Sequence, residues 1–354
     1  MNSKNRLTKA LQIDYPFVQA PMLGVTTPAM VAAISNTGAL GSLPIGNLPP
    51  DKTLALIQQT KSLTDKPFAV NLFANSIPGL INEDAWNAMQ EFLQQFAGRY
   101  ELPFQKQTIE GLQFYSYEEQ VDILIKENIP VVSFTFGVPN DDAITDLHKN
   151  NVQLIGTATS AEEAVYLNDK GIDMITAQGI EAGGHRGTFL HKEIPQVGLM
   201  ALLPQVIDIV DKPVLAAGAI ADGKSIKAAM ALGADGVQVG SAFIACNESA
   251  ANTTYKKAVQ QITGSDTALT KSYTGRWLRC VNNEFIQTLE SSGLAINEYP
   301  IQQALTAFLR TLHQHKNAMQ FLPMLTGQNV RRSYMKDAAE IFMDMIKEAE
   351  LSKQ

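Results

Sequence analysis

Residues 214–241 read VLAAGAIADGKSIKAAMALGADGVQVGS and contain a complete strand–helix–strand pattern. The apolar runs Val214–Ala217 and Gly236–Val239 are continuous rather than alternating, which predicts parallel strands covered on both faces. The residues between them predict a helix. Each run ends at a glycine, Gly218 or Gly240, where the backbone can turn tightly and approach a ligand closely.

The same pattern recurs along the chain and predicts an α/β fold. Further apolar runs, mostly followed by helix-like segments, occupy residues 17–20, 39–42, 68–71, 131–134, 153–155 and 172–177. Eight such units predict a (β/α)8 TIM-type barrel. A doubly wound open sheet is the alternative, but no G-x-G-x-x-G opens the helix after the first strand, which weakens a dinucleotide fold.

Two regions depart from the repeat. The barrel is expected over residues 1–246, with an insertion at about residues 73–116 on a β/α loop. An insertion of that length is typical of a lid or of a subunit contact, which leaves a homodimer open. Residues 247–354 are expected to be a mainly helical region that covers the substrate. Its last helix should pack on the barrel through apolar residues at helical spacing, namely Ile341, Phe342, Met345 and Ile346.

Composition narrows the class of partner. Of the 354 residues, 45% are hydrophobic and 18% charged, which is enough apolar material for a large core and too little charge for disorder. The net charge of −7 gives no footprint for nucleic acid and no attraction to an anionic membrane. A small molecule is therefore the expected partner.

Cysteine usage and the absence of targeting signals indicate a compartment. Cys246 and Cys280 form no C-x-x-C pair, so we expect no disulfide framework and no metal site. No uninterrupted apolar stretch approaches the roughly 20 residues of a membrane helix. The first residues lead into no signal-peptide core. The expectation is a cytoplasmic protein.

A glycine-rich turn follows the sixth apolar run. Residues 177–187 read AQGIEAGGHRG, with four glycines, one glutamine and one histidine. In a β/α barrel, chemistry gathers where the strands end. His185 could move a proton or donate a hydrogen bond to a bound anion there. A glycine-rich surface loop with a solvated histidine is the alternative.

The turns after the last two strands predict an anion site. Loops at this position of a barrel often cradle a phosphate, and Gly218 and Gly240 expose backbone N–H groups. Ser241 could N-cap a short helix whose amino end favours an anion. No lysine or arginine lies in either turn, so such a site would work through backbone dipoles. The alternative is that the glycines serve only the tight turns.

Amide side chains at other strand ends extend this site. Asn71 and Gln178 can donate to and accept from the edge of a heterocycle. Gly183 and Gly184 carry no side chain, which leaves space for a planar ring. The combination suits a planar ring with a phosphate tail, such as flavin mononucleotide (FMN). A phosphosugar fits the phosphate equally well but needs fewer amide partners.

Short motifs lie in order along nearly the whole chain. They are Gln19-Ala20-Pro21-Met22, Asn71-Leu72-Phe73, Ser133-Phe134-Thr135-Phe136-Gly137, Ala177 to Gly187, Ala216 to Ser241, Tyr299-Pro300-Ile301-Gln302 and Thr326-Gly327-Gln328. Together they resemble the nitronate monooxygenases, formerly called 2-nitropropane dioxygenases. The last two resemble signatures of the bacterial class I branch.

The resemblance implies an FMN enzyme that oxidises alkyl nitronates with O2 to a carbonyl compound and nitrite. Propionate 3-nitronate is a typical class I substrate. His185 falls on the family's active-site histidine and would bind and orient the anion, either protonated or as a hydrogen-bond donor. Tyr299 and Gln328 are expected to contact substrate. The resemblance assigns FMN binding to Met22, Asn71, Gln178, Gly183, Gly218, Gln238, Val239, Gly240 and Ser241.

Departures and rivals accompany this resemblance. Ala219 stands where the family commonly has a second glycine, and Ser241 where it often has threonine. One rival is a flavin-dependent enoyl-acyl-carrier-protein reductase, which shares the barrel and a similar Gly-Gly-His motif and oxidises NADH. The long insertion and the motifs at Tyr299 and Gln328 favour the monooxygenase. A second rival is a flavin-free phosphate-binding barrel.

Overall fold

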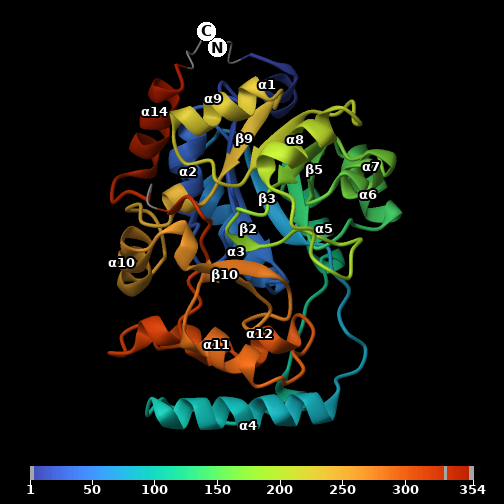
Figure 1. Cartoon of the computed structure of the whole chain (residues 1–354). Coiled ribbons are helices and arrows are strands. Elements are labelled where there is room, and N and C mark those ends of the chain that lie inside the picture. Colours follow the sequence, from blue (N-terminus) through green and yellow to red (C-terminus); the bar gives the residue numbers. More distant parts are fainter. Residues whose placement is uncertain (1–3, 331–332, 351–354) are drawn as a thin grey trace.

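Eight parallel strands form one sheet that curls into a barrel (Figure 1). The computed structural model describes residues 4–330 and 333–350. The strand order is β1-β9-β8-β6-β5-β4-β3-β2, and a parallel bridge between Val18 and Leu40 joins its two ends. This ring confirms the barrel and excludes the open sheet. The strands are β1 (Phe17–Gln19), β2 (Gly41–Gly46), β3 (Phe68–Phe73), β4 (Val131–Thr135), β5 (Gln153–Ala158), β6 (Met174–Gln178), β8 (Val214–Ala217) and β9 (Gly236–Val239).

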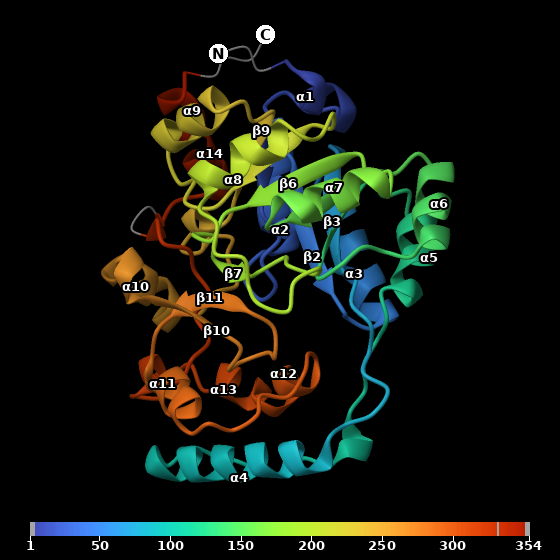
Figure 2. The same cartoon turned by 45° about the vertical axis from the view of Figure 1, so that its right-hand side comes forward.

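Helices alternate with these strands and cover the outside of the ring (Figure 2). Several begin at a side chain that accepts a backbone N–H, as Thr27, Asn140, Ser160 and Asp222 do. The helices are α2 (Pro28–Asn36), α3 (Pro50–Lys61), α5 (Glu118–Lys126), α6 (Asp141–Lys149), α7 (Ala161–Asp169), α8 (Leu199–Ile207) and α9 (Gly223–Ala231). The last helix, α14 (Ala338–Glu348), packs on α2 and α9 with the four predicted apolar residues buried.

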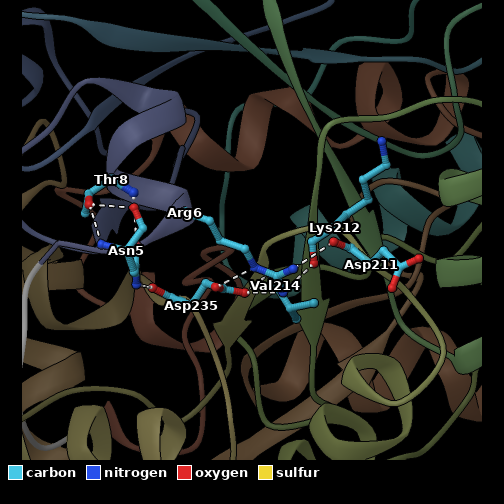
Figure 3. A network of polar contacts seen from close by, with 7 residues as sticks. All are labelled: Asn5, Arg6, Thr8, Asp211, Lys212, Val214 and Asp235. Carbon is cyan, nitrogen blue, oxygen red and sulfur yellow. Dashed lines mark hydrogen bonds and ion pairs between the residues drawn. The ribbon is translucent and has the colours of Figure 1, made fainter.

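The first helix, α1 (Arg6–Leu11), closes the amino-terminal end of the barrel. Leu7 and Leu11 are buried in a cluster with residues from the starts of most barrel strands, such as Val18 and Met174. Arg6 holds the helix in place through both carboxylate oxygens of Asp235 and through the backbone carbonyls of residues 211 and 212 (Figure 3). This end of the barrel is therefore packed shut, and the opposite end remains for a site.

A covering unit lies over the other end and is built from two distant segments. The insertion contributes the long helix α4 (Glu83–Arg99). The C-terminal region contributes α10 (Thr253–Gln261), α11 (Glu284–Ser291), α12 (Ile301–Leu305) and α13 (Ala307–Thr311). Phe96 of α4 packs edge-on against Phe285 of α11, with ring centroids 5.2 Å apart. Figure 2 shows α4 beneath these helices and away from the barrel.

The C-terminal region also contains strands that the sequence did not predict. β10 (Thr267–Thr270) and β11 (Leu278–Val281) pair antiparallel. β11 also pairs with β7 (Gly184–His185), which belongs to the glycine-rich turn after β6. The covering unit is therefore hydrogen-bonded directly to that turn.

Within residues 4–330 and 333–350, no helix has the length and apolar character needed to cross a membrane. Cys246 and Cys280 are both buried and free. The same residues contain no group of three or more His, Cys, Asp or Glu side chains arranged to hold a metal ion.

Replacing Leu7 by alanine tests the packing at the closed end. Leu7 is fully buried, so we expect the free energy of unfolding to fall by about 2–5 kcal/mol, which chemical denaturation measures. Lys9→Ala is the control, because this exposed side chain of the same helix should change the stability by less than about 0.5 kcal/mol. An equal loss in both variants would contradict this account of the barrel floor.

Candidate active site

A buried arginine organises the turn after β6. Arg186 is 1% exposed, and its guanidinium donates to the carbonyl oxygens of Gln178 and Gly179. Burial lowers its pKa to about 10, so the group stays protonated at neutral pH. The side chain of Gln178 spans the same turn, since its Nε2 donates to the His185 carbonyl and its Oε1 accepts from the Gly187 N–H, at 3.0 and 2.9 Å. The backbone of the turn is thereby fixed from inside.

His185 stands at the far end of this turn, in an aromatic surround. Its Nε2 lies 3.0 Å from the hydroxyl of Thr274. Its ring centroid is 5.0 Å from Phe136 and 5.9 Å from Phe73, both edge-on, and Tyr299 lies at 6.4 Å. Thr274 engages one ring nitrogen and leaves the other for a ligand.

The surroundings of His185 favour its neutral form. Removal from water lowers its pKa to about 3, and the nearby cations Arg310 and Arg276 act in the same direction. Of the two forms considered from the sequence, the structure therefore favours the neutral imidazole that hydrogen-bonds, and not the imidazolium.

Positive charge at this site comes from two arginines that the sequence patterns did not single out. The guanidinium of Arg276 lies 4.9 Å from the ring centroid of Phe136. Burial lowers the pKa of both Arg276 and Arg310. Within the described part of the chain, neither has a carboxylate at ion-pair distance. An enclosed cation without a counter-ion favours binding of an anion.

The predicted phosphate turns lie together beneath the segment around Gly327. A Cβ added at Gly183 would lie 2.3 Å from the Gly327 nitrogen, so only glycine fits there. The hydroxyl of Ser241 accepts from the Gly327 N–H at 2.9 Å. Ser241 is the first residue of a three-residue 3-10 helix whose N-cap is Gly240, so its expected N-cap role is wrong.

Unpartnered polar groups at these turns fit a phosphate. Among the described residues, the backbone N–H groups of Gly218 and Gly240 find no acceptor. The buried hydroxyl of Thr326, next to Gly183, has no hydrogen-bond partner either. Donors at strand-end glycines are the groups that bind phosphate oxygens in barrels of this kind.

Ala219 occupies a conformation that favours glycine. Its φ is +55°, in the left-handed region, where a Cβ is unfavourable. Its carbonyl accepts from the side chain of Asn329 at 2.9 Å, which holds this turn in place. The departure from the family pattern at Ala219 is thus accommodated with local strain and without loss of the turn.

The other residues predicted to bind FMN lie in or next to the barrel strands. Asn71 is buried and donates to Ser133 at 3.0 Å, and Gln238 accepts from Thr176 at 3.3 Å. Val239 is fully buried and can offer a ligand only its backbone. Met22 lies beside Gly240, at the turn that follows β9. Their contacts with FMN stay predictions.

The two predicted substrate residues are in different settings. Tyr299 lies in the aromatic surround of His185, and its hydroxyl donates to Asn47 at 2.7 Å. Gln328 is exposed, and its backbone N–H donates to the Glu181 carbonyl in the turn after β6. The structure thus brings Tyr299 to the histidine and gives Gln328 no recorded contact with it.

A parallel barrel with a histidine and glycine-rich turns at the carboxyl ends of its strands has the architecture of a (β/α)8-barrel enzyme. The sequence model of the family described as nitronate monooxygenase matches residues 4–348. The chain belongs to that family, whose members are oxidoreductases.

Individual relatives agree with this assignment. A probable nitronate monooxygenase of Staphylococcus saprophyticus is 38% identical over 352 residues, which cover 99% of this chain and 98% of the relative. The solved structure of a nitroalkane oxidase from Streptomyces ansochromogenes is 34% identical with a TM-score of 0.87, over 98% of both chains. A more distant neighbour, which supports the fold alone, is the solved structure of FabK from Thermotoga maritima, 27% identical with a TM-score of 0.76 over 98% of this chain and 96% of that one.

The lowered pKa of His185 predicts a neutral ring throughout the physiological range. In an NMR titration of labelled histidine, with the signal assigned by its loss in His185→Gln, we expect no protonation between about pH 8 and about pH 5. The unfolded chain binds this proton more tightly, so His185 also makes the fold less stable as the pH falls from about 6.5 toward about 3. A titration midpoint for His185 between about pH 5 and about pH 8 would show that burial does not lower its pKa.

Proposed function

We propose that this enzyme oxidises alkyl nitronates with O2, with bound FMN, to a carbonyl compound and nitrite. The observation that carries the proposal is that His185, held by Thr274 among aromatic side chains, lies close to two arginines without counter-ions. The turn that ends at His185 adjoins the glycine-rich turns after β8 and β9. Membership of the nitronate monooxygenase family supports the same reaction.

The residues at the strand ends fit FMN. The free N–H groups of Gly218 and Gly240 and the hydroxyl of Thr326 would hold its phosphate, and Asn71 and Gln178 would lie along its ring. When bound, FMN supplies the one-electron oxidation of the nitronate and the reaction with oxygen. The protein has to hold the two molecules together and exclude water.

His185 orients the substrate in this proposal. A nitronate arrives already deprotonated, so no general base is required. In the neutral ring Nε2 accepts from the Thr274 hydroxyl, so the proton is on Nδ1, and Nδ1 donates a hydrogen bond to a nitronate oxygen. Arg310 adds a favourable potential, since it lies close enough to lower the pKa of His185. Phe73, Phe136 and Tyr299 keep the surroundings apolar, which strengthens both effects.

The substrate we propose is of the propionate 3-nitronate type. Oxygen uptake and nitrite release, measured across a short series of nitronates, test the reaction. Nitrite release that depends on O2 uptake supports it. One O2 is consumed per two nitrite ions when both oxygen atoms enter the carbonyl product, and one per nitrite when hydrogen peroxide is also formed. Brisk NADH oxidation with no activity toward any nitronate would instead indicate the reductase, and a colourless purified protein would indicate a flavin-free barrel.

Replacing His185 by alanine should leave flavin bound and reduce kcat/KM for nitronates by about 10²-fold or more, because a donor to the anion is lost. Flavin absorbance per chain and nitrite release are the two measurements. His313→Ala is the control, since this histidine lies away from the turn. Wild-type turnover in His185→Ala would exclude the orienting role.

Replacing Gly218 by valine should lower the flavin content. The φ of Gly218 is +122°, and an added Cβ would lie 3.3 Å from the Ala182 nitrogen, so the turn must shift. Gly171→Val is the matched control, because Gly171 also has a left-handed φ of +76° but nothing within 4 Å of an added Cβ. Both variants should lose some stability. Full flavin occupancy in Gly218→Val would place the phosphate elsewhere.

A further inference from the structure

Asn47 lies directly after β2 and bonds to two parts of the chain that cover the barrel. Its Nδ2 donates to the backbone carbonyl of Tyr115, near the end of the insertion, at 3.1 Å. Its Oδ1 accepts from the hydroxyl of Tyr299, in the C-terminal region, at 2.7 Å. One side chain thus connects the end of a barrel strand with both segments of the covering unit.

The chemistry of the partners fixes the direction of both hydrogen bonds. A backbone carbonyl can only accept, so the amide nitrogen of Asn47 has to face Tyr115. The amide oxygen therefore faces Tyr299, and an amide oxygen can only accept as well. The phenol of Tyr299 must then be the donor, with its single proton directed to Asn47. Toward the rest of the site, the phenol oxygen presents only lone pairs.

Tyr299 is close enough to His185 for this direction to matter. Its ring centroid lies 6.4 Å from that of His185 and 5.3 Å from that of Phe136. Tyr299 is buried, and burial raises the pKa of its phenol well above the usual value, so the proton stays on the oxygen. Arg276 and Arg310 both act on the phenol electrostatically, and lone pairs suit these two cations better than a proton does.

A phenol proton turned toward the site would compete with His185. In the proposed function, Nδ1 of His185 is the donor that orients the nitronate. A buried hydroxyl without an acceptor is unfavourable, so a Tyr299 that had lost Asn47 would donate to a bound anion instead. Binding sites select one arrangement by excluding the wrong contact as well as by making the right one. Asn47 excludes the wrong contact here by accepting the phenol proton.

We propose that Asn47 is a positioning residue, which turns the hydroxyl of Tyr299 away from the nitronate and leaves His185 as the donor that orients the anion. Tyr299 then contributes its ring, and not its proton, to the substrate site. The direction of the hydrogen bond follows from the contacts of Asn47 alone, whereas its effect on the nitronate rests on the proposed function.

NMR of tyrosine labelled with carbon-13 at Cζ tests the direction without turnover, and Tyr299→Phe assigns the signal. Asn47→Leu removes the acceptor, so the Tyr299 signal should move toward the position of a phenol that donates no hydrogen bond. Asn47→Asp supplies a charged and stronger acceptor, so it should move the signal the opposite way. This second variant decides the question if Asn47→Leu does not fold. A signal that stays in place in either variant would overturn the proposal.

The kinetic test is a rescue by a second substitution. Asn47→Leu should lower kcat for propionate 3-nitronate about tenfold without raising KM, because the freed phenol proton holds the anion in another orientation. Adding Tyr299→Phe removes that proton, so the double variant should have the kcat of Tyr299→Phe alone. A residue that only supports the fold would not be rescued in this way. An unchanged kcat in Asn47→Leu, or a double variant slower than Tyr299→Phe, would overturn the role of Asn47.

Gln120→Leu is the matched control. The fully buried Gln120 side chain donates to the Leu48 carbonyl at 2.9 Å and to Thr53, so it anchors the same loop after β2 without bonding to Tyr299. This variant should lose stability and leave both the Tyr299 signal and kcat unchanged. Equal effects of Asn47→Leu and Gln120→Leu would show that the loop, and not the hydroxyl, is responsible.

The outcome is separable from that of the proposed function. In a protein that oxidises no nitronate, the Tyr299 signal still decides the direction of the hydrogen bond. Nitronate oxidation with no rescue by Tyr299→Phe keeps the reaction and rejects the role of Asn47.

Discussion

The site depends on a guanidinium buried inside a turn. Arg186 binds the carbonyl oxygens of Gln178 and Gly179, and Gln178 binds the chain on both sides of Arg186. Glu163 extends this support, since its fully buried carboxylate accepts from the backbone N–H groups of residues 189 and 190. Glycine gives this turn more conformational freedom than other residues would, and these contacts hold His185 in one position.

The covering unit supplies the part of the His185 site that the barrel does not. The pairing of β7 with β11 joins the histidine turn to the C-terminal region, which also supplies Thr274, Arg276 and Tyr299. The insertion supports that region from outside through Phe96 and Phe285. The elements that enclose His185 exclude water from it, and this removal from water is also the main cause of its lowered pKa.

The barrel could be predicted from the sequence because each of its strands leaves a signal in a short stretch of neighbouring residues. Continuous apolar runs such as Val214–Ala217 predict buried parallel strands, and the glycines at their ends indicate turns. β10 and β11 escaped prediction because their pairing depends on each other and on Gly184–His185, about 90 residues away in sequence. Arg276 and Arg310 carry no motif, and they become functional candidates only through their burial beside His185. Ser241 was assigned a cap from its residue type, but its hydroxyl is engaged by Gly327 across the fold.

In the proposed function, the turn after β6 presents a nitronate to a flavin bound at the Gly218 and Gly240 turns. Anaerobic mixing of the purified protein with propionate 3-nitronate, followed by visible absorbance, measures the reduction of the flavin by the nitronate in the absence of oxygen. We expect the flavin spectrum to change with the nitronate and to stay unchanged with NADH. A spectrum that is unaffected by nitronates and bleached by NADH would contradict the proposed function.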